Sequence, residues 1–186
     1  MPTSNRVLAR ERSVLLVIDL QEGYRGKLHQ EERLVGAARR MLRAATFLGV
    51  PVVLTEQYPK GLGATRREIA ELLPPDARRF EKTSFSALGV PDLHAHLRTL
   101  EREQIVVVGI ETHVCVSQTA HDLLDLGYSV HAVRDAISAR FPLEDEAGFG
   151  KMIGSGAVPA SSEGALFEWL RDARAAEFKS IHRLVV

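Results

Sequence analysis

The hydrophobic pattern of this 186-residue chain alternates between two kinds of segment. Short, continuous apolar runs are typical of strands that are buried on both faces, as in a parallel sheet. Such runs predict strands at 13–19, 51–55, 104–108 and 128–133, with weaker candidates at 79–82 and 156–159. Between them, apolar residues at helical spacing predict helices at 30–48, 66–73, 92–100, 116–126, 143–155 and 161–170, and a helical tail at 176–186.

Strands that alternate with helices of this length indicate an α/β domain with helices on both faces of the sheet. We therefore expect a single three-layer α/β/α domain over 1–186, with a mainly parallel, Rossmann-like sheet of about six strands. Its core spans 13–172, followed by the helical tail, and no repeat or linker divides it.

Composition narrows the choice of partners and compartment. Lys plus Arg and Asp plus Glu number 24 each, so charge gives no support to nucleic acid or an acidic membrane as partner. A single cysteine cannot form an internal disulfide, and residues 1–12 contain no apolar signal-peptide core. The longest apolar run, 14–18, is too short to span a bilayer. A cytoplasmic protein with no membrane partner is the simplest interpretation.

Three chemically capable side chains follow predicted strands: Asp19, Lys82 and Cys115. Ligands of open α/β sheets bind at the carboxyl ends of the strands, so this shared position favours a common site. Cys115 also lies where a helix is expected to start, and a helix N-terminus stabilises a thiolate. Each residue has an ordinary alternative, namely a loop carboxylate, a surface lysine or a buried structural cysteine.

Segments 15–21, 82–86 and 109–120 resemble, in this order, the three signatures of the isochorismatase-like cysteine hydrolases. The resemblance extends over about 14–169 and is strongest in Glu111-Thr112-His113-Val114-Cys115-Val116, which is most similar to the isochorismatase domain-containing branch. It implies that Cys115 is the nucleophile, Asp19 its general base and Lys82 the cation that holds the pair. A free thiol is only a few per cent thiolate at neutral pH, so a nucleophilic cysteine needs such neighbours.

The resemblance also implies an oxyanion hole formed by the backbone N–H groups of Glu111 and Cys115, with a cis peptide bond between Ile110 and Glu111. The vinyl-ether hydrolases that give the family its name lack the nucleophilic cysteine. The presence of Cys115 in this sequence therefore implies, by the resemblance, hydrolysis of a C–N bond in a small amide or ureido compound, through a thioester. Nicotinamidases of the family carry an Asp-x-His metal site after the second strand, whereas 55–63 offers Glu56 and no histidine. We therefore expect no metal and no other cofactor.

Candidate residues for a substrate pocket lie in the strand-end loops: Gln21, Tyr24, Tyr58, Phe85 and His113. The alternative is that these side chains pack on their own domain. Two other functions also stay open, a catalytically quiet scaffold that binds a partner and a thiol redox sensor, although no second cysteine could resolve an oxidised thiol. By the family pattern we expect a small-molecule substrate and a homo-oligomer, a dimer or larger, in which the apolar end 184–186 either contacts another subunit or docks on its own domain.

Overall fold

Six strands form one sheet in the computed structural model, which describes residues 5–186. The sheet order is β3-β2-β1-β4-β5-β6, and every neighbouring pair is parallel. The strands are β1 (Ser13–Ile18), β2 (Val52–Gln57), β3 (Arg78–Lys82), β4 (Gln104–Gly109), β5 (Ser129–Ile137) and β6 (Val158–Ala160). The strand order reverses between β1 and β4, which creates a crevice at their carboxyl ends.

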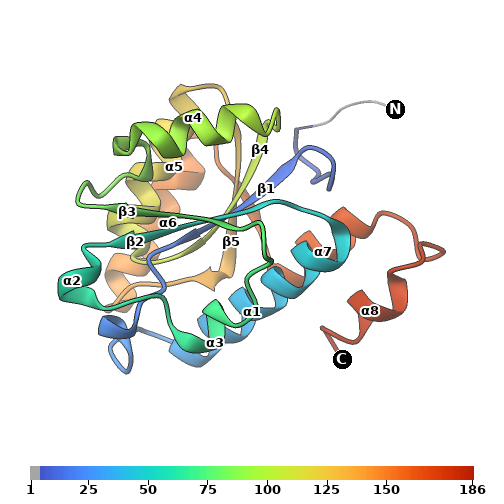
Figure 1. Cartoon of the computed structure of the whole chain (residues 1–186), viewed down its shortest axis with the longest axis horizontal. Coiled ribbons are helices and arrows are strands. Elements are labelled where there is room, and N and C mark those ends of the chain that lie inside the picture. Colours follow the sequence, from blue (N-terminus) through green and yellow to red (C-terminus); the bar gives the residue numbers. More distant parts are fainter. Residues whose placement is uncertain (1–4) are drawn as a thin grey trace.

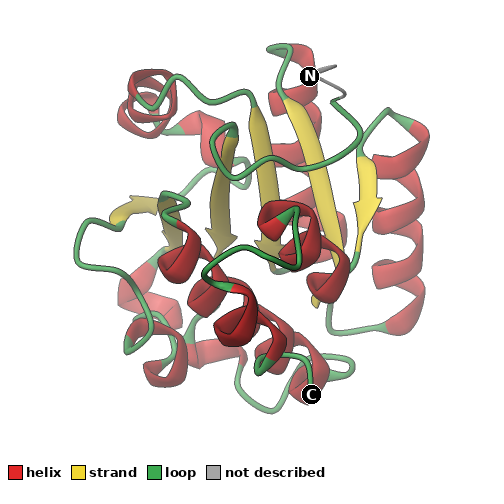
Figure 2. Ribbon diagram, turned by 90° about the vertical axis from the view of Figure 1, so that its right-hand side faces the viewer, coloured by secondary structure: helices red, strands yellow, loops and turns green. Residues whose placement is uncertain are grey.

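Helices cover both faces of the sheet (Figures 1 and 2). One layer contains α1 (Glu31–Leu48), α3 (Arg67–Ala70), α7 (Ser162–Leu170) and α8 (Phe178–His182). The other contains α4 (Pro91–Thr99), α5 (Ser117–Asp125) and α6 (Pro142–Gly154). Short turns complete the chain: η1 (Glu22–Tyr24), α2 (Pro59–Leu62), η2 (Ala87–Gly89) and the π-helical η3 (Thr112–Val116). The predicted single-domain α/β fold is confirmed.

The continuous apolar pattern of β1 follows from its central position. Successive side chains point to opposite faces, so Leu15 and Val17 enter the core beneath α1 while Val14, Leu16 and Ile18 enter the core beneath α5. All six residues of the strand are buried. Each large apolar side chain contributes roughly 1.5–3 kcal/mol by leaving water, which makes β1 the rigid support from which the next residue, Asp19, projects.

Most predicted elements occur within a few residues of their expected ends, and four differ in a way that matters. Strand β5 continues to Ile137, past its expected end at 133, after a register shift opposite Val107 and Gly109. The helix expected at 66–73 is only the single turn of α3, and the one expected at 116–126 is divided into η3 and α5. The tail helix is limited to α8, whose Ile181 is buried in the core. No helix within residues 5–186 has the length and apolarity needed to cross a bilayer.

Candidate active site

The sheet topology brings Asp19 and Cys115 to the same crevice, because β1 and β4 are neighbours whose connections leave in opposite directions. The close approach of the two chains depends on Gly109, which has φ 125°. A Cβ at this position would lie 2.0 Å from the Ile18 carbonyl oxygen, so no other residue fits. The next amide, of Ile110, donates to that same oxygen at 3.0 Å. The segment after β4 is thus fixed against the end of β1.

Asp19 is a buried carboxylate with two different partners. Its Oδ1 accepts a hydrogen bond from Thr55 Oγ1 at 2.7 Å, and its Oδ2 lies 2.7 Å from Lys82 Nζ. Oδ2 makes no well-aligned hydrogen bond within the described residues. The carboxylate is therefore held on one side and retains a lone pair for a further proton.

Lys82 is the last residue of β3, and its ammonium group is completely buried. Besides Asp19, it donates to Gln57 Oε1 at 2.6 Å and to the carbonyl oxygens of Phe85 and Ser84 at 2.9 and 3.2 Å. A buried charge needs a partner and hydrogen bonds, and Lys82 has both. This set of oxygens fixes Nζ beside the Asp19 carboxylate.

Cys115 lies in η3 and interacts with both Asp19 and Lys82. Its side chain and backbone together are 7% exposed, so the thiol is nearly enclosed. Burial is the largest of the causes that together raise the pKa of Cys115 to about 12; the Asp19 carboxylate acts in the same direction, while Lys82 lowers the pKa. This direction is opposite to the one that a helix N-terminus alone would give. Cys115 is the fourth residue of the π-turn, and desolvation with an adjacent anion outweighs the cation.

The backbone before the cysteine has an unusual form. The Ile110–Glu111 peptide bond is cis, and the Glu111 N–H donates to no other group of the described chain. The Glu111 side chain is held by Arg140, whose backbone N–H and Nε both donate to Oε2 at 3.0 Å. On the following residue, Thr112 Oγ1 donates to the buried carboxylate of Asp145. The free amide is thus fixed from both sides.

A family comparison agrees with this fold. Residues 13–164, most of the chain, match the model of the isochorismatase domain. The chain belongs to the isochorismatase family. It has the fold of this family of hydrolases, with a cysteine in the crevice at the strand ends.

Curated relatives cover nearly the whole chain. Isochorismatase domain-containing protein 2 of Xenopus laevis is 41% identical over 180 residues, which are 96% of this chain and 86% of the relative. The secreted isochorismatase effector Isc1 of Phytophthora sojae is 44% identical over 177 residues, 93% of this chain and 84% of the effector. Among solved structures, the MAR1 ribonuclease of Caenorhabditis elegans superposes with a TM-score of 0.92 at 35% identity, over 96% of this chain and 92% of the worm protein.

Two of the candidate pocket residues lie close to the catalytic candidates. The Tyr24 phenol is partly buried; burial raises its pKa, and the nearby charges of Glu111, Cys115 and Asp19 act in the same direction. Gln21 instead has a structural role, since Nε2 donates to the Gln57 and Gly63 carbonyl oxygens at 3.0 and 2.6 Å. Its Oε1 accepts from the Gln57 N–H. Tyr24 is therefore the better candidate for contact with a ligand.

Tyr58, Phe85 and His113 lie at the edges of the site. The exposed Tyr58 lines a cavity of about 330 Å³ with Lys82 and Thr83, whereas Cys115 is not in its lining. Phe85 is also exposed, and its carbonyl oxygen is what contacts Lys82. His113 Nε2 lies 3.9 Å from Glu144, and its buried Nδ1 has no hydrogen-bond partner in the described chain.

The acidic side chain in the region that holds the metal in nicotinamidases is already engaged. Glu56 Oε1 accepts from the Thr65 N–H at 2.7 Å and from Thr65 Oγ1 at 2.6 Å, and Arg79 lies 3.7 Å away. Within residues 5–186, no three His, Cys, Asp or Glu side chains are close enough together to hold a metal ion.

Three residues that orient the site were not among the candidates from the sequence: Thr55, Gln57 and Arg140. Thr55 and Gln57 lie at the carboxyl end of β2, beside Asp19. The strand-end rule that selected Asp19 could have selected both. Arg140 follows β5, and only the fold shows that this loop reaches Glu111.

Proposed function

We propose that this protein is a cysteine-dependent hydrolase that cleaves a C–N bond of a small amide or ureido compound through a thioester. The observation that carries the proposal is the buried Asp19–Lys82 pair, 2.7 Å apart, built against the chain's single cysteine. A carboxylate and an ammonium in contact with one thiol supply a base, a counter-charge and a nucleophile. A structural cysteine needs none of these.

In the first half-reaction, Cys115 Sγ attacks the carbonyl carbon while its proton passes to the Asp19 carboxylate. The carbonyl oxygen becomes an oxyanion, which the free Glu111 N–H and the Cys115 N–H stabilise. Collapse of this intermediate breaks the C–N bond, and protonated Asp19 gives its proton to the leaving nitrogen. The acyl group is then held on Sγ as a thioester.

In the second half-reaction, Asp19 takes a proton from water as the water oxygen attacks the thioester carbon. The C–S bond breaks, Sγ recovers the proton from Asp19, and the carboxylic acid is released. Lys82 is held beside the carboxylate by its oxygen partners and offsets the negative charge there. Because the thiol pKa is about 12, removal of the proton during attack accounts for the chemistry better than a preformed thiolate.

The proposal is tested by ammonia release from a panel of small amides and ureido acids, with the Cys115→Ala protein as control. Turnover that is absent in the Cys115→Ala protein, together with a covalent acyl adduct on Cys115 in mass spectra, supports it. Turnover retained by Cys115→Ala contradicts the nucleophile assignment. An RNA substrate belongs in the panel because the worm relative is named a ribonuclease. If RNA is cleaved and no amide is, the proposed reaction is wrong; if nothing in the panel is turned over, the scaffold alternative is favoured.

We also propose that the protein works as a homo-oligomer in the cytoplasm. A protein of related fold, the YcaC gene product of Escherichia coli, is 20% identical to this chain and is described as an octameric hydrolase. The Phytophthora relative, in contrast, is named as secreted. Light scattering after size exclusion should give a mass of two or more chains, and fractionation of the source cells should recover the protein with cytoplasmic markers.

A further inference from the structure

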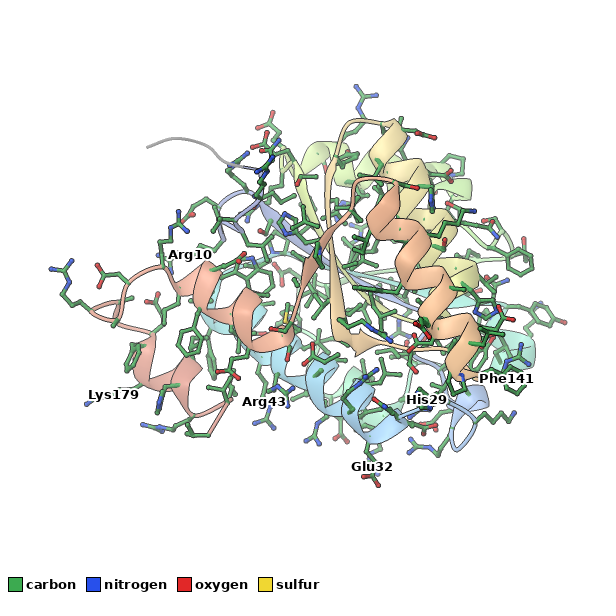
Figure 3. The ribbon with its side chains drawn as sticks, turned by 180° about the vertical axis from the view of Figure 1, so that it is seen from behind. Arg10, His29, Glu32, Arg43, Phe141 and Lys179 are labelled. Atoms are coloured by element: carbon green, nitrogen blue, oxygen red, sulfur yellow. The ribbon has the colours of Figure 1, made fainter. Side chains whose placement is uncertain are left out.

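A second hollow lies on the outer surface of the α1 layer, lined by side chains that the proposed hydrolysis does not use. Its volume is about 230 Å³, and its lining comes from two segments far apart in sequence: Gly36, Arg39, Arg40, Arg43, Arg183 and Leu184. Figure 3 shows Arg43 on the outside of α1, and helix α8, which precedes Arg183, packs against α1. Four of the six lining residues are arginines, and none is acidic.

In the described chain, three of the four arginines of this pocket lack a carboxylate partner, whereas Arg40 is paired with Asp135. Most arginines outside the pocket do pair with a carboxylate, as Arg66 does with Glu31 and Arg134 with Asp145. Within residues 5–186, no carboxylate pairs with the side chains of Arg39, Arg43 or Arg183. Like charges four residues apart on a helix repel each other, so Arg39 and Arg43 destabilise α1 unless an anion lies between them.

Arg40 gives the hollow a fixed wall. Its Nη2 lies 3.2 Å from Asp135 Oδ2 and 3.0 Å from Ser162 Oγ, so its guanidinium is oriented by β5 and α7. Gly36 leaves space beside it, because a Cβ there would meet only Arg40 Nη1, at 3.9 Å. The hollow is therefore lined by planar guanidinium donors, of which that of Arg40 is already held in place, and it has room for a small anion.

We propose that this arginine pocket binds a compact, multiply charged phosphate compound, such as an inorganic polyphosphate or the phosphate chain of a nucleotide. Arginine forks match tetrahedral phosphate oxygens with pairs of N–H donors, and several of them satisfy more than one negative charge. A monocarboxylate would leave most of these donors unused. An extended acidic peptide would require a longer groove than the six lining residues provide.

The test is calorimetric titration of the full chain with tripolyphosphate and, separately, with ATP at low ionic strength. The pocket variant is Arg39→Gln/Arg43→Gln/Arg183→Gln. Its matched control is Arg78→Gln/Arg98→Gln/Lys151→Gln, which removes the same charge from exposed positions elsewhere. We expect at least a tenfold loss of tripolyphosphate affinity in the pocket variant and less than a twofold loss in the control. Binding of ATP but not of tripolyphosphate would identify the ligand as a nucleotide. Binding of both would identify it as a free polyphosphate chain.

A second variant, Gly36→Glu, introduces a carboxylate into the pocket. The position is in the interior of α1, where glutamate is a better helix former than glycine, so this variant should fold at least as well as the parent. Its carboxylate should replace the anion as partner of the arginines and abolish binding. The proposal is overturned if the parent binds neither tripolyphosphate nor ATP, if the control loses as much affinity as the pocket variant, or if Gly36→Glu binds like the parent.

Discussion

Replacement of Asp19 by Asn should make Cys115 more reactive toward alkylating agents and, at the same time, inactive in turnover. The substitution keeps the size of the side chain and an oxygen that can accept from Thr55, but it removes the negative charge beside the thiol. That charge is one of the causes that raise the pKa of Cys115, and Lys82 opposes it. Without Asp19, the cation acts unopposed and the thiolate is easier to form.

The size of the effect follows from the burial of the pair. Two unit charges about 4 Å apart interact with roughly 4 kcal/mol at an effective dielectric constant near 20, which corresponds to about 3 pKa units. Asn leaves the burial of the thiol unchanged, so desolvation continues to hold the pKa above its ordinary value. We therefore expect the pKa of Cys115 to fall by about 2–3 units from about 12.

A fall of this size raises the thiolate fraction at pH 8 by about 100- to 1000-fold. The thiolate also becomes a weaker nucleophile as its pKa falls, which removes about half of the logarithmic gain. Iodoacetamide should thus modify Cys115 about 10- to 30-fold faster in Asp19→Asn than in the parent, as measured by intact-protein mass spectrometry.

The dependence of the alkylation rate on pH tests separately whether the pKa of Cys115 falls in Asp19→Asn. In the parent, the alkylation rate should rise about tenfold per pH unit through pH 10, because the thiol is still protonated there; in Asp19→Asn, the rise should level off at lower pH. The matched control is Asp172→Asn, an exposed carboxylate paired with Arg174, which should alkylate like the parent. Equal or slower alkylation of Asp19→Asn would contradict this prediction, because the Asp19 charge would then not oppose thiolate formation.

Three further predictions test other parts of the site. Cys115→Ala should abolish ammonia release from any amide that the parent hydrolyses, and residual release above about one per cent in the same assay would contradict covalent catalysis. Arg140→Met should lower kcat about tenfold with KM changed less than twofold, because Glu111 would no longer be held and its N–H would stabilise the oxyanion less well; a change in KM alone would assign Arg140 to substrate binding. Gly148→Ala should lower the free energy of unfolding in urea by about 1–3 kcal/mol, since its Cβ would lie 2.6 Å from His113 Cα. Gly150→Ala in the same helix, where a Cβ meets nothing within 4 Å, should raise that free energy by up to about 1 kcal/mol; equal effects of the two substitutions would show that the contact between α6 and η3 is not tight.

The fold could be predicted because its signals are local and repeated. Strands β1 and β4 are buried on both faces, so their sequences are continuously apolar, and few structures besides a central parallel strand produce so short a run. Helix α1 ends where Gly49 adopts a left-handed conformation with φ 66°, a common helix end with its own sequence signal. The strand-end rule then selected Asp19, Lys82 and Cys115 without knowledge of the strand order.

The parts that could not be predicted depend on contacts between distant segments. The π-turn η3 includes a bond from the Val116 N–H to the Glu111 carbonyl oxygen, and no apolar periodicity distinguishes this from the first turn of an α-helix. The extension of β5 to Ile137 depends on pairing with Gly109 beyond a register shift. The position of Arg140 against Glu111 follows from that extension. The ion pair between them therefore cannot be predicted from the sequence of either segment alone.

The most consequential difference concerns the resting state of the thiol. A helix-start cysteine suggests a thiolate that is ready to react, but such a thiol would also be open to oxidation. Burial and the Asp19 charge instead raise the pKa of Cys115, which favours the protonated thiol at rest. This disfavours a redox sensor, because oxidation follows thiolate character and exposure. In the hydrolysis that we propose, the base would then act during attack, so that Cys115 would reach full reactivity only with a carbonyl group between the thiol and the free N–H of Glu111.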